Sequence, residues 1–251
     1  GGYAIPFNLI VPEGIKVLEK GAFVAADEED PGVCHLYVGY VLQSSIPVYK
    51  LKVDRKVWTL DSYDGNKEKL SDTTNAANIP LLIPTNQISG YFEGKSNPYA
   101  SWNKPSKVEI NLTIPDDLED YEQKALNKLQ NGDLPNPFFT LGQVEMNVGS
   151  KDATGLYRIE AKAKIKSNLP VNGYGIGLFV FYDGDGNVIG MSTASCKDLG
   201  DCSSMDSVKL DSNAEDELNM VLPYKVQTPP VKAVIYQIVD SGIGQNLTTI
   251  K

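Results

Sequence analysis

The stretch VEINLTI at residues 108–114 decides the fold class, because its apolar and polar residues alternate without a break. On an extended backbone, successive side chains point to opposite faces, so Glu109, Asn111 and Thr113 share one face and the aliphatic residues share the other. The same period of two recurs at residues 158–166. Both stretches predict strands with one buried face and one solvated face.

Seven further segments are rich in β-branched and aromatic residues and are bounded by Gly, Pro, Asn or Asp. They are residues 36–42, 51–60, 144–148, 175–182, 188–192, 217–222 and 231–239. Many short strands at this spacing favour antiparallel sandwich packing. We therefore predict an all-β fold built from two antiparallel immunoglobulin-like β-sandwiches.

One segment, at residues 116–130, breaks the period of two. It carries apolar side chains at helical spacing, begins with acidic residues and ends at an Asn-Gly pair. The prolyl stretch that follows cannot continue a helix. We expect this one helix to connect two domains: an N-terminal β-sandwich at residues 1–115, the helix and Pro-rich linker at 116–137, and a C-terminal β-sandwich at 138–251.

The charge balance narrows the range of partners. The 251 residues include 23 Lys and Arg against 32 Asp and Glu, a net charge of -9, and this charge repels the phosphates of nucleic acid. No apolar run approaches the roughly 20 residues that cross a bilayer as a helix, so we expect no transmembrane segment. The chain opens at Gly1 without Met, and we expect that a signal peptide has been removed and that the protein is extracytoplasmic.

Two cysteines form a candidate disulfide. Cys196 and Cys202 bracket a short polar loop. They are either bridged or free, because the sequence does not reveal the redox compartment in which the protein resides. We expect Cys34 to be a buried, unreactive thiol. The single histidine, His35, follows it directly, but adjacent side chains of a strand point to opposite faces. A Cys-His nucleophile pair is therefore not expected.

Sequence motifs of catalysis and cofactor binding are missing from the chain. It has no Gly-x-Ser-x-Gly elbow, no phosphate-binding Gly-rich loop and no dinucleotide fingerprint, so we expect no cofactor and no catalytic residues. Carboxylates dispersed along the chain leave one alternative open, a carbohydrate-active or peptide-processing enzyme.

The oxygen-rich stretch DGDGN at residues 183–187 is a weak candidate calcium site through Asp183, Asp185 and Asn187. The glutamate that would complete an EF-hand-type loop does not follow in register. Asp-Gly and Gly-Asn pairs supply the positive φ angles of tight turns between strands. We therefore predict a hairpin turn here and no metal site.

The loop at residues 96–103 is the candidate ligand-binding site. It presents Tyr99 and Trp102, a rigidifying Pro, and the hydrogen-bonding side chains of Asn97 and Asn103. Exposed aromatic rings on a constrained polar loop are typical of protein and carbohydrate recognition. The alternative is that Trp102 folds back onto the sandwich as part of the core.

The C-terminal half carries a resemblance to a known family. The run AKIKSNLPV at residues 163–171, followed by IGLFVFYD at 176–183 and GNVI at 186–189, resembles the FxLYD-type immunoglobulin-like domains of bacterial surface lipoproteins. The resemblance covers about residues 155–240. It implies a sandwich fold and a cell-surface location, and it implies no catalytic residues.

The N-terminal half matches this family less well, because a long Asn/Thr-rich insertion is expected at residues 71–78. Taken together, the sequence predicts a non-enzymatic extracytoplasmic module with a binding or structural role. The expected partner is a protein or a carbohydrate at the surface loop.

Overall fold

A computed structural model describes residues 1–94, 97–193 and 208–251. Its elements, in chain order, are β1 (Tyr3–Ala4), β2 (Phe7–Ile10), β3 (Ile15–Ala26), β4 (Val33–Ser44), β5 (Leu51–Asp61), η1 (Ser62–Asp64), β6 (Lys67–Ile79), β7 (Ile88–Gly94), β8 (Tyr99–Ala100), β9 (Asn103–Thr113), α1 (Asp120–Gln130), β10 (Phe139–Leu141), β11 (Glu145–Val148), β12 (Ile159–Ser167), β13 (Gly173–Tyr182), β14 (Val188–Thr193), β15 (Val208–Leu210), β16 (Glu215–Val221), β17 (Lys232–Ile238), η2 (Ser241–Ile243) and α2 (Gly244–Leu247). The all-β prediction is confirmed.

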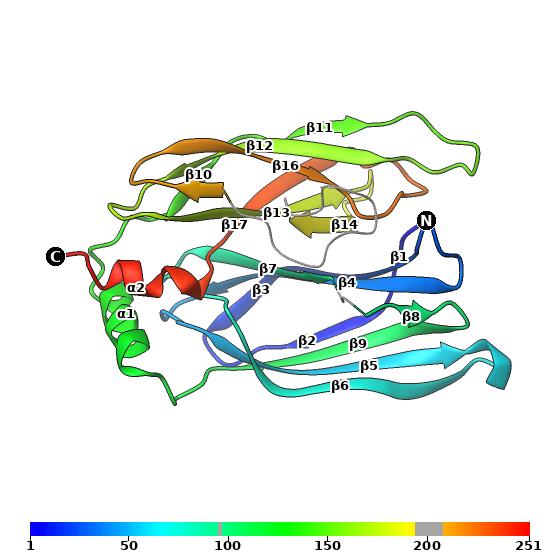
Figure 1. Ribbon diagram of the computed structural model, residues 1–251, viewed down its shortest axis with the longest axis horizontal. Helices are drawn as coiled ribbons and strands as arrows, with labels where there is room; N and C mark the ends of the chain where they lie inside the picture. The colour runs from blue at the N-terminus through cyan, green and yellow to red at the C-terminus, as the bar shows by residue number, and fades with distance from the viewer. Residues whose placement is uncertain (95–96, 194–207) are drawn as a thin grey trace.

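The sheets lie in four layers (Figure 1). The outer N-terminal sheet has the strand order β2-β9-β5-β6, and the inner N-terminal sheet has the order β1-β3-β4-β7 with β8 beside β4. The inner C-terminal sheet is β14-β13-β15 with β17 beside β13, and the outer C-terminal sheet is β10-β12-β11 with β16 beside β12. Each half of the chain is therefore a two-sheet sandwich, and the two inner sheets face each other.

The alternating stretch that predicted the fold class lies in β9, at the centre of the outer N-terminal sheet. Val108, Ile110 and Leu112 are buried in the N-terminal core. β9 pairs antiparallel with β5 on one side and parallel with β2 on the other. The parallel β2–β9 pair departs from the purely antiparallel expectation, because the chain enters the outer sheet at β2 before it crosses to β3 in the inner sheet.

The expected insertion at residues 71–78 is part of a strand. It belongs to β6, which pairs antiparallel with β5 at the edge of the outer N-terminal sheet. Nearly all of β6 is exposed or half-buried. An edge strand with so little burial tolerates a polar composition, and polar residues also discourage pairing with another chain. The Asn/Thr-rich composition reflects this exposure and not a loop.

The lysines of the second alternating stretch lie on the solvated face of β12. Lys162, Lys164 and Lys166 stand across from Glu145 of β11 and from Glu217 and Glu215 of β16. Cross-strand pairs of opposite charge stabilise such a ladder. This face therefore forms no basic patch.

Helix α1 begins at Asp120, four residues after the predicted start at residue 116. The reason is local, because the Glu119 backbone N–H donates to the Glu122 side chain at 3.0 Å and caps the first turn. Ala125 and Leu129 bury their side chains in the core. The buried carboxylate of Glu122 also accepts from Lys50 Nζ at 3.0 Å, which ties the helix to the N-terminal half.

The inner N-terminal sheet and the C-terminal half share a hydrophobic core, which is distinct from the core inside the N-terminal sandwich. Phe23, Tyr37 and Phe92 of the inner N-terminal sheet belong to the same buried cluster as Leu178 and Phe179 of the inner C-terminal sheet. Glycines let the sheets approach closely: a Cβ added at Gly39 would lie 3.1 Å from Met191 Sδ, and one at Gly90 would lie 3.1 Å from Leu178 Cδ2. The predicted division at residues 116–137 remains a prediction, now with extensive packing across it.

A buried pair of glutamines completes this interface. Gln237 of β17 donates to the Ile88 carbonyl at 2.8 Å and to Gln87 Oε1 at 3.1 Å. Its own Oε1 accepts from the Phe139 backbone N–H at 3.1 Å, and Gln87 Oε1 accepts from the Phe138 N–H at 2.9 Å. Both glutamines are buried. The pair therefore joins the chain entering β10 to β7 and β17.

Candidate ligand-binding groove

The loop that contains Trp102 is held in place by backbone hydrogen bonds. It connects β8 to β9, and the Trp102 carbonyl accepts from the Ser62 backbone N–H at 2.9 Å and from Ser62 Oγ at 3.1 Å. Ser62 opens η1, whose first turn is capped by Asp61: its carboxylate accepts from the Tyr63 N–H at 2.9 Å. The loop is thereby fixed against a second turn that is distant in sequence.

Two aromatic rings meet at this junction. Trp102 is 42% exposed and Tyr63 is 81% exposed, and their ring centroids lie 5.3 Å apart with planes inclined at 44°. The alternative, in which Trp102 folds back into the core, is wrong, because a core tryptophan would lose nearly all of its exposed surface. Trp102 is partly exposed, and its role in binding stays a prediction.

The rings stand beside a groove of about 450 Å³. Its lining combines aromatic and aliphatic side chains with hydroxyl, amide and ammonium groups: Tyr3, Ile5, Leu60, Ser62, Asn66, Ser101, Trp102, Lys104, Pro105 and Ser106. We call this the aromatic groove. Its volume lies within the range of small-molecule sites, and a mostly apolar lining with a few polar groups is typical of them. No carboxylate is among the lining residues.

The other predicted binding residues occupy different positions. Tyr99 points between the two N-terminal sheets, where its hydroxyl donates to Asp72 Oδ2 at 3.2 Å and burial raises its pKa to about 12. Asn103 Oδ1 is enclosed and accepts no hydrogen bond. Asn97 is exposed. Of the four predicted residues, only Trp102 lines the aromatic groove.

Three residues at this site escaped the sequence reasoning. Tyr3 of β1 and Leu60 at the end of β5 line the groove. Tyr63 of the exposed turn η1 is outside the lining and contacts the Trp102 ring. The signal available in the sequence was Tyr63 itself, a large aromatic in a polar turn beside Asp and Gly. The sequence gives no sign that this turn contacts the loop that contains Trp102.

The ring of the second tryptophan, Trp58, is less accessible to a ligand. Trp58 lies on the outer face of β5, and Lys107 Nζ sits 4.2 Å from its ring centroid. A cation this close occupies the face of the ring. The rings of Trp102 and Tyr63 are therefore more accessible than that of Trp58.

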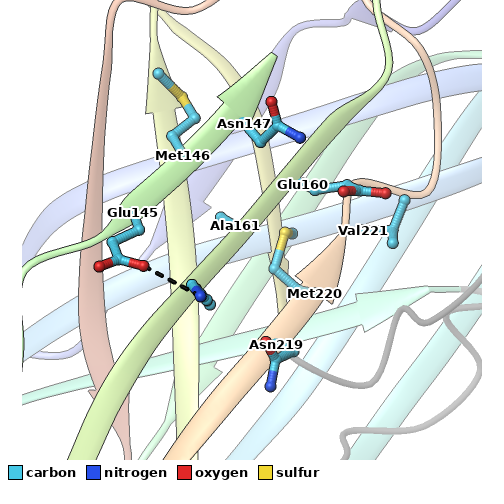
Figure 2. A pocket seen from close by; sticks show the side chains of 9 residues that line it. Glu145, Met146, Asn147, Glu160, Ala161, Asn219, Met220 and Val221 are labelled. Carbon is cyan, nitrogen blue, oxygen red and sulfur yellow. Dashed lines mark ion pairs between the residues drawn. The ribbon is translucent and has the colours of Figure 1, made fainter. Parts of the chain in front are cut away.

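A larger hollow of about 560 Å³ lies on the outer C-terminal sheet and differs in character. Figure 2 shows its side chains on three adjacent strands, β11, β12 and β16. Its carboxylates are engaged by bases: Glu145 lies 3.3 Å from Lys162 Nζ, and Glu160 lies 3.4 Å from Arg158 Nε. The lining has no aromatic residue. These ion pairs suit a solvated sheet face better than a pair of catalytic acids.

Cys34 and His35 point to opposite sides of β4. Cys34 is buried in the N-terminal core, and burial raises the pKa of its thiol, as expected for an unreactive cysteine. His35 Nε2 lies 2.7 Å from Asp27 Oδ2. The hydrogen bond from His35 is the main cause that lowers the pKa of the Asp27 carboxyl. The pair ties the β3–β4 loop to the sheet.

This pair predicts a pH dependence of stability. The pKa of Asp27 is lower in the folded state than in the unfolded state, so its contribution is present above the unfolded value of about 3.9 and is lost as the pH falls through the folded value. Asp27→Asn should lower the free energy of unfolding at pH 7 by less than about 1 kcal/mol. Urea denaturation from pH 7 to pH 3 checks this, and a difference between the two proteins that stays constant over that range would contradict it.

The oxygen-rich stretch at residues 183–187 forms the turn between β13 and β14. Asp183 Oδ1 accepts from the backbone N–H groups of Asp185 and Asn187, each at 2.9 Å, and these bonds lower its pKa. Gly186 has φ of 81°. The hairpin therefore uses the Asp183 carboxylate itself. That this turn binds no calcium stays a prediction.

Three further sequence predictions concern a disulfide, a transmembrane segment and a metal site. Cys196 and Cys202 lie outside the described residues. Within residues 1–94, 97–193 and 208–251, no helix has the length and apolar character needed to cross a membrane. Over the same residues, no group of three or more potential metal-ligating side chains occurs.

Comparison with known proteins does not assign the chain to a group. No protein-family model matches it, and no curated protein matches it.

Proposed function

We propose that the chain is a non-catalytic, extracytoplasmic binding module that holds a neutral oligosaccharide in the aromatic groove. The observation that carries the proposal is the exposed pair of Trp102 and Tyr63 beside a groove lined by serine and asparagine side chains. The apolar face of a sugar ring packs on an aromatic ring, and its hydroxyl groups exchange hydrogen bonds with short polar side chains.

The groove chemistry favours binding over catalysis. Hydrolysis of a glycosidic bond commonly needs two carboxyl groups on either side of the bond, and the aromatic groove has none in its lining. The same absence disfavours a cationic ligand, while the net charge of -9 disfavours an acidic one. A neutral, hydroxyl-rich ligand fits both conditions.

The extracytoplasmic location is supported by the resemblance of residues 155–240 to domains of bacterial surface lipoproteins. It gains a direct test from Cys196 and Cys202, because a disulfide persists in oxidising compartments. Mass spectrometry of the unreduced protein, purified from its native source, should find these two thiols protected from alkylation. Three alkylatable thiols would remove this support.

Trp102→Ala tests the binding site. Neutral oligosaccharides are first screened on an array and the hits are titrated by calorimetry. Loss of the exposed ring should weaken binding by on the order of 2 kcal/mol, since a central aromatic anchor commonly contributes this much. The melting temperature should change little, because 42% of the Trp102 surface is already exposed.

Tyr121→Ala is the matched control, because this residue of α1 is 40% exposed and lies far from the groove. It should leave binding unchanged. Loss of several degrees in melting temperature by Trp102→Ala would make that residue structural and end the proposal. Binding of a protein partner, with no saccharide retained on the array, would also overturn it.

A further inference from the structure

A separate hollow lies beside η2. Figure 1 shows that η2 leads into α2 at the end of the molecule where α1 and α2 pack. The hollow has a volume of about 340 Å³. Its walls are Phe139, Tyr174, Ile176, Val239 and Ile243, and among the described residues Asp240 is the one charged side chain in the lining. Apart from that carboxylate, the side chains present aromatic and aliphatic surface with a single phenol hydroxyl.

The Asp240 carboxylate is fixed by the turn it caps. Its Oδ1 accepts from the Gly242 backbone N–H at 2.7 Å. The adjoining backbone is held on both sides: Asp240 forms a bridge with Leu81, and the Ser241 carbonyl accepts from the Tyr49 hydroxyl at 2.8 Å. The charge therefore has a defined position at the wall of the hollow.

The charge of Asp240 has no basic partner in the described part of the chain. No lysine, arginine or histidine there lies within ion-pair distance of it. Lys209, which stands opposite Tyr174 across the β13–β15 pair, is exposed. The negative charge of Asp240 contributes to raising the pKa values of Tyr49 and Tyr91 of the N-terminal half, where burial is the main cause. Burial raises the pKa of the Asp240 carboxyl, as expected for a carboxylate that has lost water and gained no cation.

Tyr174 supplies the second recognition element. It is 56% exposed although it lines the hollow, so its ring is accessible from the solvent side. The face of an aromatic ring attracts an ammonium group, and aliphatic walls accept the alkyl part of the same molecule. Asp240 and Tyr174 thus offer a carboxylate and a ring to one cation.

We propose that this hollow binds a small organic ammonium ion with a short apolar body. The charged nitrogen lies at Asp240, and the apolar body lies against Ile176, Val239 and Ile243 with Tyr174 at the entrance. The site is independent of the aromatic groove, which lies at the opposite end of the molecule and has no carboxylate in its lining.

Titration with n-butylammonium, followed by amide chemical shifts in NMR spectra, tests the proposal. The neutral n-butanol has the same apolar body and serves as the reference ligand. Butylammonium should saturate shifts around the hollow and bind at least about tenfold more tightly than butanol, because one partly desolvated charge pair supplies about that factor.

Two variants separate recognition from folding. Asp240→Asn keeps an oxygen that can accept from the Gly242 N–H and should abolish the preference for the ammonium over the alcohol. Tyr174→Leu keeps an apolar side chain at an exposed position and should weaken butylammonium binding several-fold. Asp133→Asn, an exposed carboxylate in the linker, controls for the general attraction of cations to a protein of charge -9 and should change nothing.

Equal affinity for butylammonium and butanol would overturn the proposal, because the hollow would then be only an apolar gap. Full retention of the ammonium preference in Asp240→Asn, or the same loss in Asp133→Asn, would overturn it by placing the recognition elsewhere. Failure of butylammonium to saturate any shift around the hollow would do so as well.

Discussion

Replacement of Gln237 by Leu is expected to lower the free energy of unfolding by about 3 kcal/mol or more. Leucine fits the volume of the buried side chain but removes every hydrogen bond that it makes. The Phe139 N–H and the Ile88 carbonyl would each lose their glutamine partner, and each buried polar group left unpaired costs about 1–3 kcal/mol. Chemical denaturation monitored by fluorescence and by circular dichroism measures the loss.

Gln143→Leu is the matched control, because Gln143 is exposed in the segment between β10 and β11. Its effect should stay within about 0.5 kcal/mol, as for most surface substitutions. A loss for Gln237→Leu no greater than that of Gln143→Leu would show that the glutamine pair contributes nothing net to the interface between the halves.

Replacement of Gly90 by Val is the second change with a large expected effect. Even the first added carbon would lie 3.1 Å from Leu178 Cδ2, 3.2 Å from Leu178 Cβ and 3.5 Å from Ile238 Cγ1. Overpacking of a core commonly costs about 1–3 kcal/mol, and the two further methyl groups of valine bring the expected loss to the upper part of that range. The melting temperature should fall by several degrees.

The same substitution at Gly184 provides the comparison. No atom lies within 4 Å of a Cβ added there, so Gly184→Val should unfold almost as the parent protein does. Because Gly90 lies where the two inner sheets meet, its replacement should shift the whole unfolding curve as one transition. Two resolved transitions, of which only one moves, would contradict the view that the shared core couples the halves.

The sequence predicted strands both where apolar residues alternate, as in β9 and β12, and where they follow one another, as in β4 and β13. Two long or glycine-rich strands escaped for physical reasons. In β3, a register shift between Val17 and Glu19 breaks the alternation. In β7, Gly90 leaves space for Leu178 of the facing sheet, so its pattern reflects a partner that lies far away in sequence. The polar edge strand β6 escaped because exposure, and not packing, selects its residues.

The candidate site was predictable only in part. A tryptophan in a constrained polar loop indicated Trp102, but its partner Tyr63 comes from a turn that precedes β6 and reaches the loop only through pairing of the outer sheet. Tyr99 was expected beside Trp102, yet it lies in β8 and its side chain enters the space between the N-terminal sheets. The hollow around Asp240 gave no signal, since its walls come from β10, β13 and the turn after β17.

The four-layer stacking has a consequence for how this chain can vary. The two inner sheets are covered on both sides, and residues 36–42 of β4 and 175–182 of β13 are buried without interruption. Neither face of these strands can accept a polar replacement, whereas in strands of the outer sheets every second position faces solvent and can vary.

Each sandwich also shields an apolar face of the other from water. A chain that lost its C-terminal half would expose Phe23, Tyr37 and Phe92, and an apolar face of that kind promotes aggregation. The halves are therefore expected to be inherited together.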